Sequence, residues 1–536
     1  MSRLERFSEN TILESLGFSL KKRTIAVVVA DNEMSLSQHN LNEVVKAVKE
    51  GIIANQFNAV TFHLSTLCDD LTCGTYANKF VLPMRDSVSN TVECYGSIDD
   101  IDGFVFVANQ PTVIAGMLFG AIRSNKPCLF VSGGYMPTAS VNNTKYGFNS
   151  SYEFVGASNA GLMSAEDLEN MKSQLITCIG NASDSYAANS ANILVEAIGL
   201  ALQGNSTYPA YSNQRILLAR KTGERITTMV EKIITPQLFI NDDSLTTALA
   251  VDLSFGSSSI SFLNMQALLR INKNKNPLQY IIEMSKQIPR LVDISTSSGI
   301  FMEDFAEAGG VYALLTHLKK LGHATLKHTA YNGKQVGDII KGCQISEGSG
   351  ISFTNTKPRG LTFLNGNIAE TGAISFLNEV PVFTGKAKVF DCEESAFDAI
   401  LCREIKKGDV LVIINEGPKS GPGMREIRLP IALLKGMNLD KDVAVITDGR
   451  VENISRGIVV GCVTPETCQN GNIQLIQNND TIEINLQKGK VTVDVSSKDL
   501  NKREKSYVCK KVEASSYLNK FANSARTAME GVTVAK

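Results

Sequence analysis

The stretch 103–131 reads GFVFVANQPTVIAGMLFGAIRSNKPCLFV and has two apolar runs on either side of a helical pattern. The runs 103–108 and 127–131 contain β-branched and aromatic residues without alternation, which is typical of strands covered on both faces. Between them, residues 113–123 place apolar side chains at helical spacing. The order strand, helix, strand predicts a βαβ unit with parallel strands and a right-handed crossover.

The same pattern occurs closer to the N-terminus. Residues 24–30, TIAVVVA, form another apolar run without alternation. The segment that follows, LNEVVKAVKEGI, places Leu41, Val44 and Val48 on one face of a helix. We therefore expect the N-terminal half of the chain to be an α/β domain with a largely parallel sheet.

The second part of the chain is richer in short strands, which are separated by Gly, Asn and Asp turns. The expected strands lie at 361–364, 387–390, 410–414 and 443–447, and in the segments TIEINLQ and KVTVDV. A last helix is expected around 516–529. The sequence thus predicts an N-terminal α/β domain at 1–350 and a smaller β-rich domain at 351–536.

The charges of the chain nearly cancel, because 53 Lys and Arg stand against 54 Asp and Glu. This balance gives no global field for a nucleic acid or an anionic membrane. The apolar runs are far shorter than the roughly 20 residues that cross a bilayer. The first twenty residues read as an amphipathic helix and lack the apolar core of a signal peptide. We expect a cytoplasmic protein with no nucleic-acid or membrane partner.

The segment 408–450 carries the strongest resemblance to known proteins. It reads GDVLVIINEGPKSGPGMREIRLPIALLKGMNLDKDVAVITDGR, and it closely resembles the signature of the dihydroxy-acid and 6-phosphogluconate dehydratase family. Further similarity lies in GIFMEDFAEAGGVYALL, AKVFDCEESAFDAI, AANSANILVEAIGLAL and SSYLNKFANSARTAMEGV. The resemblance extends over nearly the whole chain.

This resemblance implies an architecture and a chemistry. Family members have a three-layer α/β domain followed by a β-barrel-like domain, are usually dimeric, and hold the active site between the two domains. They are hydro-lyases that remove water from dihydroxy or sugar acids, as in branched-chain amino acid biosynthesis. An iron of an iron-sulfur cluster acts as Lewis acid on the leaving hydroxyl, and a magnesium ion holds the carboxylate end.

The three cluster cysteines of the family have no counterpart in this chain. By the flanking matches, their positions fall at Ser37 in NEMSLSQHNL, at Gln110 in VANQPTVIAGM and at about Ala182 in GNASDSYAANS. Iron-sulfur clusters require soft thiolate ligands, which serine, glutamine and alanine do not supply. We therefore expect no iron-sulfur cluster.

The magnesium ligands are also reduced in number. The family's aspartate and carbamylated lysine fall at Pro111 and Thr112, which cannot take their place. Asp69 and Glu426 match the two remaining acidic ligands, so any Mg²⁺ bound there would be held weakly. The alternative is that both carboxylates are solvated or paired with cations.

The position of the family's base serine is occupied by Glu452, in TDGRVENIS. A buried glutamate can act as a general base when its pKa is raised. With Asp69 and Glu426 close by, the carboxylates would repel one another unless some are protonated or paired. Arg85, Arg425 and Arg450 are the expected partners, and they are also candidates for binding a small anion.

The segment EGPKSGPG, residues 416–423, resembles a loop that binds anions through backbone N–H groups. Lys419, Ser420 and Gly421 are therefore candidate anion ligands, while a structural turn explains the glycines and prolines equally well. The eleven cysteines contain no C-x-x-C pair, so reduced thiols are expected. Cys68 and Cys73 flank the acidic loop, but their spacing matches no cluster motif.

Three hypotheses remain open. The first is an inactive or regulatory paralogue that keeps a pocket for a small hydroxy or sugar acid, as a homodimer or paired with an active subunit. The second is a dehydratase with cluster-independent chemistry, which predicts a closed pocket with a carboxylate of raised pKa. The third is an active dehydratase whose cluster cysteines lie elsewhere in the sequence.

Overall fold

The computed structural model describes residues 17–19, 22–39, 41–343, 351, 360–376, 379–509 and 514–534. The helix expected in the first twenty residues therefore falls almost entirely outside the described residues, and so does most of the expected domain boundary near residue 350. Among the described helices, none is both long and apolar enough to cross a membrane.

The N-terminal domain is built on a parallel four-stranded sheet in the order β2-β1-β3-β4. Its strands are β1 (Thr24–Val29), β2 (Asn58–His63), β3 (Gly103–Val107) and β4 (Cys128–Val131). Three of them coincide with the expected apolar runs, and every residue of β3 and β4 is buried. The predicted α/β class with a parallel sheet is confirmed.

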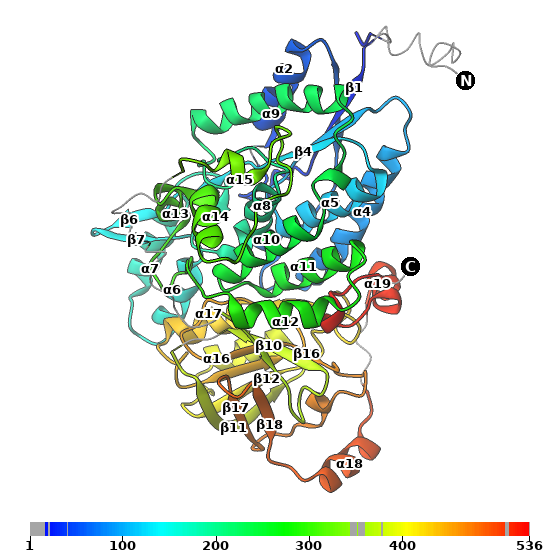
Figure 1. The fold of residues 1–536 in the computed structure, drawn as a ribbon. Coiled ribbons are helices and arrows are strands. Elements are labelled where there is room, and N and C mark those ends of the chain that lie inside the picture. The colour runs from blue at the N-terminus through cyan, green and yellow to red at the C-terminus, as the bar shows by residue number, and fades with distance from the viewer. Residues whose placement is uncertain are drawn as a thin grey trace.

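Helices cover both faces of this sheet (Figure 1). The connection from β1 to β2 runs in the opposite direction to the one from β2 to β3, so right-handed crossovers place α2 (Leu41–Ala54) and α4 (Val81–Gly96) on opposite faces. On the second face α4 packs closely on α5 (Pro111–Ser124), since a Cβ at Gly116 would lie 2.5 Å from the Arg85 carbonyl oxygen. These three layers fix where the loops after the strands emerge.

One of the remaining helices of this domain, α9 (Asn213–Glu231), packs on α2, and the others extend from α5 toward the second domain (Figure 1). These others are α3 (Asp69–Thr72), α6 (Ser150–Asn159), α7 (Ala165–Leu175), α8 (Tyr186–Ile198), α10 (Asp242–Ser254), α11 (Ser259–Ile271), α12 (Pro277–Gln287), α13 (Met302–Glu307), α14 (Gly310–Lys320) and α15 (Val336–Ile339). Short strands lie between them at β5 (Tyr135–Met136), β6 (Ala139–Val141), β7 (Thr144–Tyr146) and β8 (Asn181–Ala182).

The C-terminal domain is a mixed eight-stranded sheet in the order β18-β17-β11-β12-β14-β16-β10-β9. Its bounds are β9 (Leu361–Leu364), β10 (Gly372–Phe376), β11 (Val382–Phe390), β12 (Asp409–Ile413), β14 (Ala444–Thr447), β16 (Val459–Thr464), β17 (Thr481–Asn485) and β18 (Lys490–Val493). The two edges meet at a bridge between Asn365 and Lys490, which almost closes the sheet around an apolar core. The expected barrel-like domain is thereby confirmed.

The two domains pack through α6 and α17 (Leu429–Gly436), with α16 (Glu393–Leu401) beside α17. The approach is close, because a Cβ at Gly436 would lie 1.8 Å from the Glu153 carbonyl oxygen. A glycine at this point therefore allows the backbones to meet. The loop that precedes α17 is thereby held against the N-terminal domain, where the Glu426 N–H donates to Asn78 Oδ1.

The last expected helix is shorter than predicted. After α18 (Ser497–Ser506), helix α19 spans Ser516–Ser524 and is followed by a 3-10 turn at Ala528–Glu530. The interruption has a local cause, because Ala525 forms a bridge to Val534 and Thr527 caps the 3-10 turn. The tail thereby returns to the N-terminal domain (Figure 1).

The expectation that all cysteines are reduced is wrong for one pair. Cys468 and Cys509 form a disulfide across 41 residues of sequence. The barrel brings the loop after β16 next to the segment after α18, and no short spacing motif marks that proximity. The other nine cysteines are free thiols.

Candidate functional site

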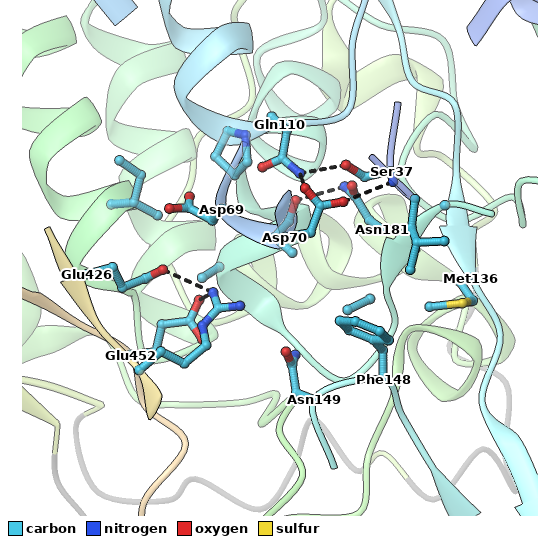
Figure 2. A pocket seen from close by; sticks show the side chains of 18 residues that line it. Ser37, Asp69, Asp70, Gln110, Met136, Phe148, Asn149, Asn181, Glu426 and Glu452 are labelled. Carbon is cyan, nitrogen blue, oxygen red and sulfur yellow. Dashed lines mark hydrogen bonds and ion pairs between the residues drawn. The ribbon is translucent and has the colours of Figure 1, made fainter. Parts of the chain in front are cut away.

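A cavity lies where the loops after β1, β2 and β3 meet the C-terminal domain (Figure 2). The N-terminal domain contributes Ser37 after β1, Asp69 and Asp70 after β2, and Gln110 after β3. The carboxyl ends of β1 and β3 form the point where the strand order reverses, which is where open α/β sheets bind ligands. The position alone therefore marks this cavity as the candidate site.

The three expected cluster positions converge on this cavity, since Ser37, Gln110 and Ala182 all line it. Gln110 stands at the N-terminus of α5, and its Nε2 donates a hydrogen bond of 2.7 Å to Ser37 Oγ. Ala182 follows on β8 and offers a methyl group. A hydroxyl, an amide and a methyl group do not fit an iron-sulfur cluster, which needs thiolates.

Asp70 completes this part of the wall. Its carboxylate accepts a hydrogen bond from Ser35 Oγ at 2.9 Å. It also accepts one from the Ser37 N–H at 3.1 Å, and Gln110 Nε2 lies 3.5 Å from it (Figure 2). The polar groups at two of the expected cluster positions therefore hydrogen-bond to each other and to Asp70. Sequence reasoning did not select Asp70, although it adjoins Asp69 in the same loop.

The two cysteines beside this loop do not replace the missing ligands. Cys68 is fully buried, and burial together with the nearby Asp70 raises the pKa of its thiol. Burial also raises the pKa of Cys73 to about 12, against the opposing effect of Arg428. Both thiols are therefore protonated near neutral pH, and neither lines the cavity.

The C-terminal domain brings Glu426, Arg428 and Glu452 to the other side of the cavity. The short strand β13 (Glu426–Ile427) pairs in parallel with β15 (Arg450–Val451), in a register that places Glu426 opposite Arg450. Arg428 directly follows β13, and Glu452 directly follows β15, so these two residues also lie side by side. This pairing is why residues 24 positions apart in sequence meet.

Arg428 joins the two glutamates, and sequence reasoning missed it. Its Nη2 lies 2.6 Å from Glu452 Oε1 and 3.1 Å from Glu426 Oε2 (Figure 2). All three side chains are nearly inaccessible to solvent, with 9% or less of each exposed. The signal in the sequence was slight, because Arg428 is one of two arginines in GMREIRLP and its partner Glu452 is remote.

The guanidinium of Arg450 is a second cation close to these carboxylates. Arg450 Nη2 donates to Asp69 Oδ1 at 3.1 Å, and Arg450 Nη1 lies 4.0 Å from Glu426 Oε1. Asn78 Nδ2 also donates to Asp69 Oδ1, at 3.0 Å. Both retained magnesium positions, Asp69 and Glu426, are thus engaged with arginine.

Burial raises the pKa of both Glu426 and Glu452, and Arg428 opposes that effect. The cavity that remains has a volume of about 40 Å³, which holds a few water molecules. Pro111 lines it at the start of α5, whereas Thr112 is buried and does not. Within the described ranges no three His, Cys, Asp or Glu side chains are grouped so as to hold a metal ion.

The glycine-rich loop 416–423 holds an anion that belongs to the chain. The backbone N–H groups of Lys419 and Ser420 both donate to Glu466 Oε2 at 2.9 Å, and Ser420 Oγ donates to the same oxygen at 2.8 Å. A Cβ at Gly417 would lie 2.2 Å from that oxygen, and one at Gly421 would lie 1.9 Å from the Asn415 carbonyl oxygen. The loop geometry is as expected for anion binding, but the carboxyl group of Glu466 occupies the place of a bound anion.

Two of the expected arginine partners lie elsewhere. Arg425 contacts Glu393 and Glu394, each at 2.8 Å. Arg85 is completely buried under the C-terminal tail, where it donates to the carbonyl oxygens of Gly531 and Val532. The expectation that these two arginines pair with the site carboxylates is wrong, because buried carbonyls and glutamates nearer to them accept their hydrogen bonds.

Comparison with known proteins places these residues in a wider context. Residues 22–339 match the family described as dihydroxy-acid/6-phosphogluconate dehydratase N-terminal, and residues 351–532 match its C-terminal counterpart. Curated relatives named dihydroxy-acid dehydratase include one from Caldanaerobacter subterraneus subsp. tengcongensis, 34% identical over 93% of this chain and 92% of that protein. Others are from Lachnospira eligens, 34% identical over 97% and 96%, and from Pyrococcus furiosus, 34% identical over 98% of each.

Proposed function

Because the chain belongs to the dihydroxy-acid/6-phosphogluconate dehydratase family, we propose that it is a cluster-independent member that no longer dehydrates hydroxy acids. Its role is that of an inactive or regulatory paralogue. It acts in the dimeric state expected of the family, either with itself or with an active subunit.

The observation that carries this proposal is the 2.7 Å hydrogen bond between Gln110 and Ser37. Two of the three positions that would hold a cluster are bonded to each other, and the third, Ala182, has no donor atom. The Lewis acid that would accept the leaving hydroxyl therefore has no ligands in this site. Fold similarity does not restore a reaction whose site residues differ.

A small hydroxy or sugar acid is not a required part of this role. The cavity volume of about 40 Å³ is far below the ~300 Å³ at which small-molecule pockets begin. A carboxylate ligand would also have to displace Glu426 or Glu452 from Arg428. Regulation through a protein partner therefore accounts for the site better than regulation through a bound acid.

The test is to purify the protein without oxygen and to measure iron, acid-labile sulfide and turnover of 2,3-dihydroxy and sugar acids. An active relative, treated in the same way, serves as the control. We expect no stoichiometric iron or sulfide and no turnover, and we expect the chain to bind an active family member when the two are expressed together. Stoichiometric iron and sulfide with turnover would overturn the proposal.

A second candidate function rests on Glu452. Its Oε2 is buried and has no hydrogen-bond partner among the described residues, and burial raises the pKa of Glu452, as expected of a general base in a cluster-independent lyase. If the purified protein turns over any hydroxy acid without iron, Glu452→Gln is expected to abolish that turnover. Unchanged turnover in the variant would exclude Glu452 from the chemistry.

A further inference from the structure

Two carboxylates contact one buried guanidinium in the candidate site, and a third carboxylate is paired with a second guanidinium. Arg428 contacts Glu426 and Glu452, while Asp69 is held on the far side of Glu426 by Arg450. Isolated buried carboxylates are costly, and proteins compensate them with a paired cation or a metal ion. In this site the compensation comes from within the chain.

We propose that Arg428 is the resident cation of this site: its guanidinium occupies the place between Glu426 and Glu452 that a divalent metal ion would otherwise hold. The site therefore needs no divalent metal ion, because the positive charge of Arg428 compensates the two glutamates. This inference concerns the cation alone, and it holds whether or not the chain has kept an activity.

The geometry gives Arg428 this role through one atom. A single nitrogen, Nη2, lies within hydrogen-bond distance of oxygens from both glutamates, as a shared cation would. A divalent ion at the same point would stand beside two guanidinium groups. Like charges about 4 Å apart repel strongly in a buried site, so metal and Arg428 exclude one another.

The carboxylates can still accept a metal once the guanidinium is gone. Glu452 Oε2 has no hydrogen-bond partner among the described residues and is buried. Glu426 adds hard oxygen atoms that suit Mg²⁺ and Mn²⁺, and water completes the coordination. Removal of Arg428 should therefore convert an internal ion pair into a divalent cation site.

The experiment measures Mn²⁺ binding by electron paramagnetic resonance in wild type and in Arg428→Ala. We expect the variant to bind about one equivalent of Mn²⁺ at least about tenfold more tightly than wild type. Guanidinium chloride at millimolar concentration should displace that Mn²⁺, because free guanidinium can re-enter the vacated place. The control is Arg456→Ala, which removes an arginine paired with Asp440 outside the cavity and should gain no Mn²⁺ binding.

Arg428→Gln provides a second route if the alanine variant does not fold. It fills more of the vacated space and can still donate to a carboxylate, but it carries no charge. We expect the same gain of Mn²⁺ binding. The inference is overturned if wild type already binds Mn²⁺ as tightly as the folded variant, or if neither variant gains an equivalent. These readings do not depend on iron content or turnover, so failure here is distinct from failure of the proposed function.

Discussion

The cavity and the glycine-rich loop differ in charge, but in both of them a side chain of the protein satisfies the buried polar groups. In the cavity, carboxylates surround an internal cation, the guanidinium of Arg428. In the loop 416–423, backbone N–H groups bind an internal acceptor, the carboxyl group of Glu466. Both regions have the shape of a ligand site, and in both a side chain of the protein takes the place of the ligand.

The comparison teaches that ligand-binding geometry can be kept while the ligand is replaced from within. Buried donors and acceptors must be satisfied whether or not a ligand is present. A side chain that satisfies such groups keeps them paired without a bound ligand. The following variants test whether the two regions behave as this account requires.

The largest effect is expected at Arg428. Arg428→Met keeps the volume of the side chain but leaves Glu426 and Glu452 buried without their cation. Removal of one partner from a buried ion pair costs about 3–5 kcal/mol, and the free energy of unfolding in urea should fall by that amount in metal-free buffer. Arg456→Met, at the less buried pair with Asp440, should cost much less. Equal losses in the two variants would contradict the special place of Arg428.

The second effect is a pH dependence at Glu466. Burial and the nearby Asp448 raise its pKa to about 7 in the folded protein, from 4.5. The folded state therefore binds the proton more tightly, so stability falls as pH rises from 4.5 through 7. Glu466→Gln should remove up to about 3 kcal/mol of that fall, since each pKa unit corresponds to about 1.4 kcal/mol.

The measurement at Glu466 is urea unfolding at pH 5 and at pH 8. The stability of wild type should decrease between the two values by more than that of the variant. An identical decrease in both proteins would show that the loop does not hold a carboxylate of raised pKa. The parallel between the loop and the cavity would then not hold for the loop.

The smallest effect is expected at Gln110. Gln110→Ala loses the hydrogen bond to Ser37 Oγ and the longer contact with Asp70. A buried hydrogen bond of this kind contributes about 1 kcal/mol, and thermal unfolding should report a loss of that order. Gln279→Ala, which removes an exposed hydrogen bond to Glu283, should lie within about 0.5 kcal/mol of wild type. If Gln110→Ala unfolds at the same temperature as wild type, the hydrogen bond between Gln110 and Ser37 does not stabilise the fold.

Much of the fold follows from local pattern. The apolar runs at β1, β3 and β4 and the strand at β9 are recovered nearly residue by residue. The edge strand β2 was not predicted, because its side chains are mostly half-buried or exposed and form no apolar run. Strands β10 and β16 were also not predicted, although every residue in both is buried.

Site residues could be predicted where the resemblance to the family gives their positions. They could not be predicted where contacts between distant segments determine which side chains meet. Ser37, Gln110 and Ala182 were expected at a common place, and the structure brings them to one cavity. Arg428 and Glu466 were missed because their partners lie in other loops, and local sequence does not show which charge will fill a site. For the same reason, Arg85 was assigned to the site although the C-terminal tail binds it.

The most direct test of the account is anomalous diffraction from crystals of the wild-type protein soaked in millimolar MnCl₂. We predict no manganese peak in the cavity and density for the Arg428 guanidinium between Glu426 and Glu452. A manganese peak among Asp69, Glu426 and Glu452, with Arg428 displaced, would contradict the claim that the chain supplies its own cation.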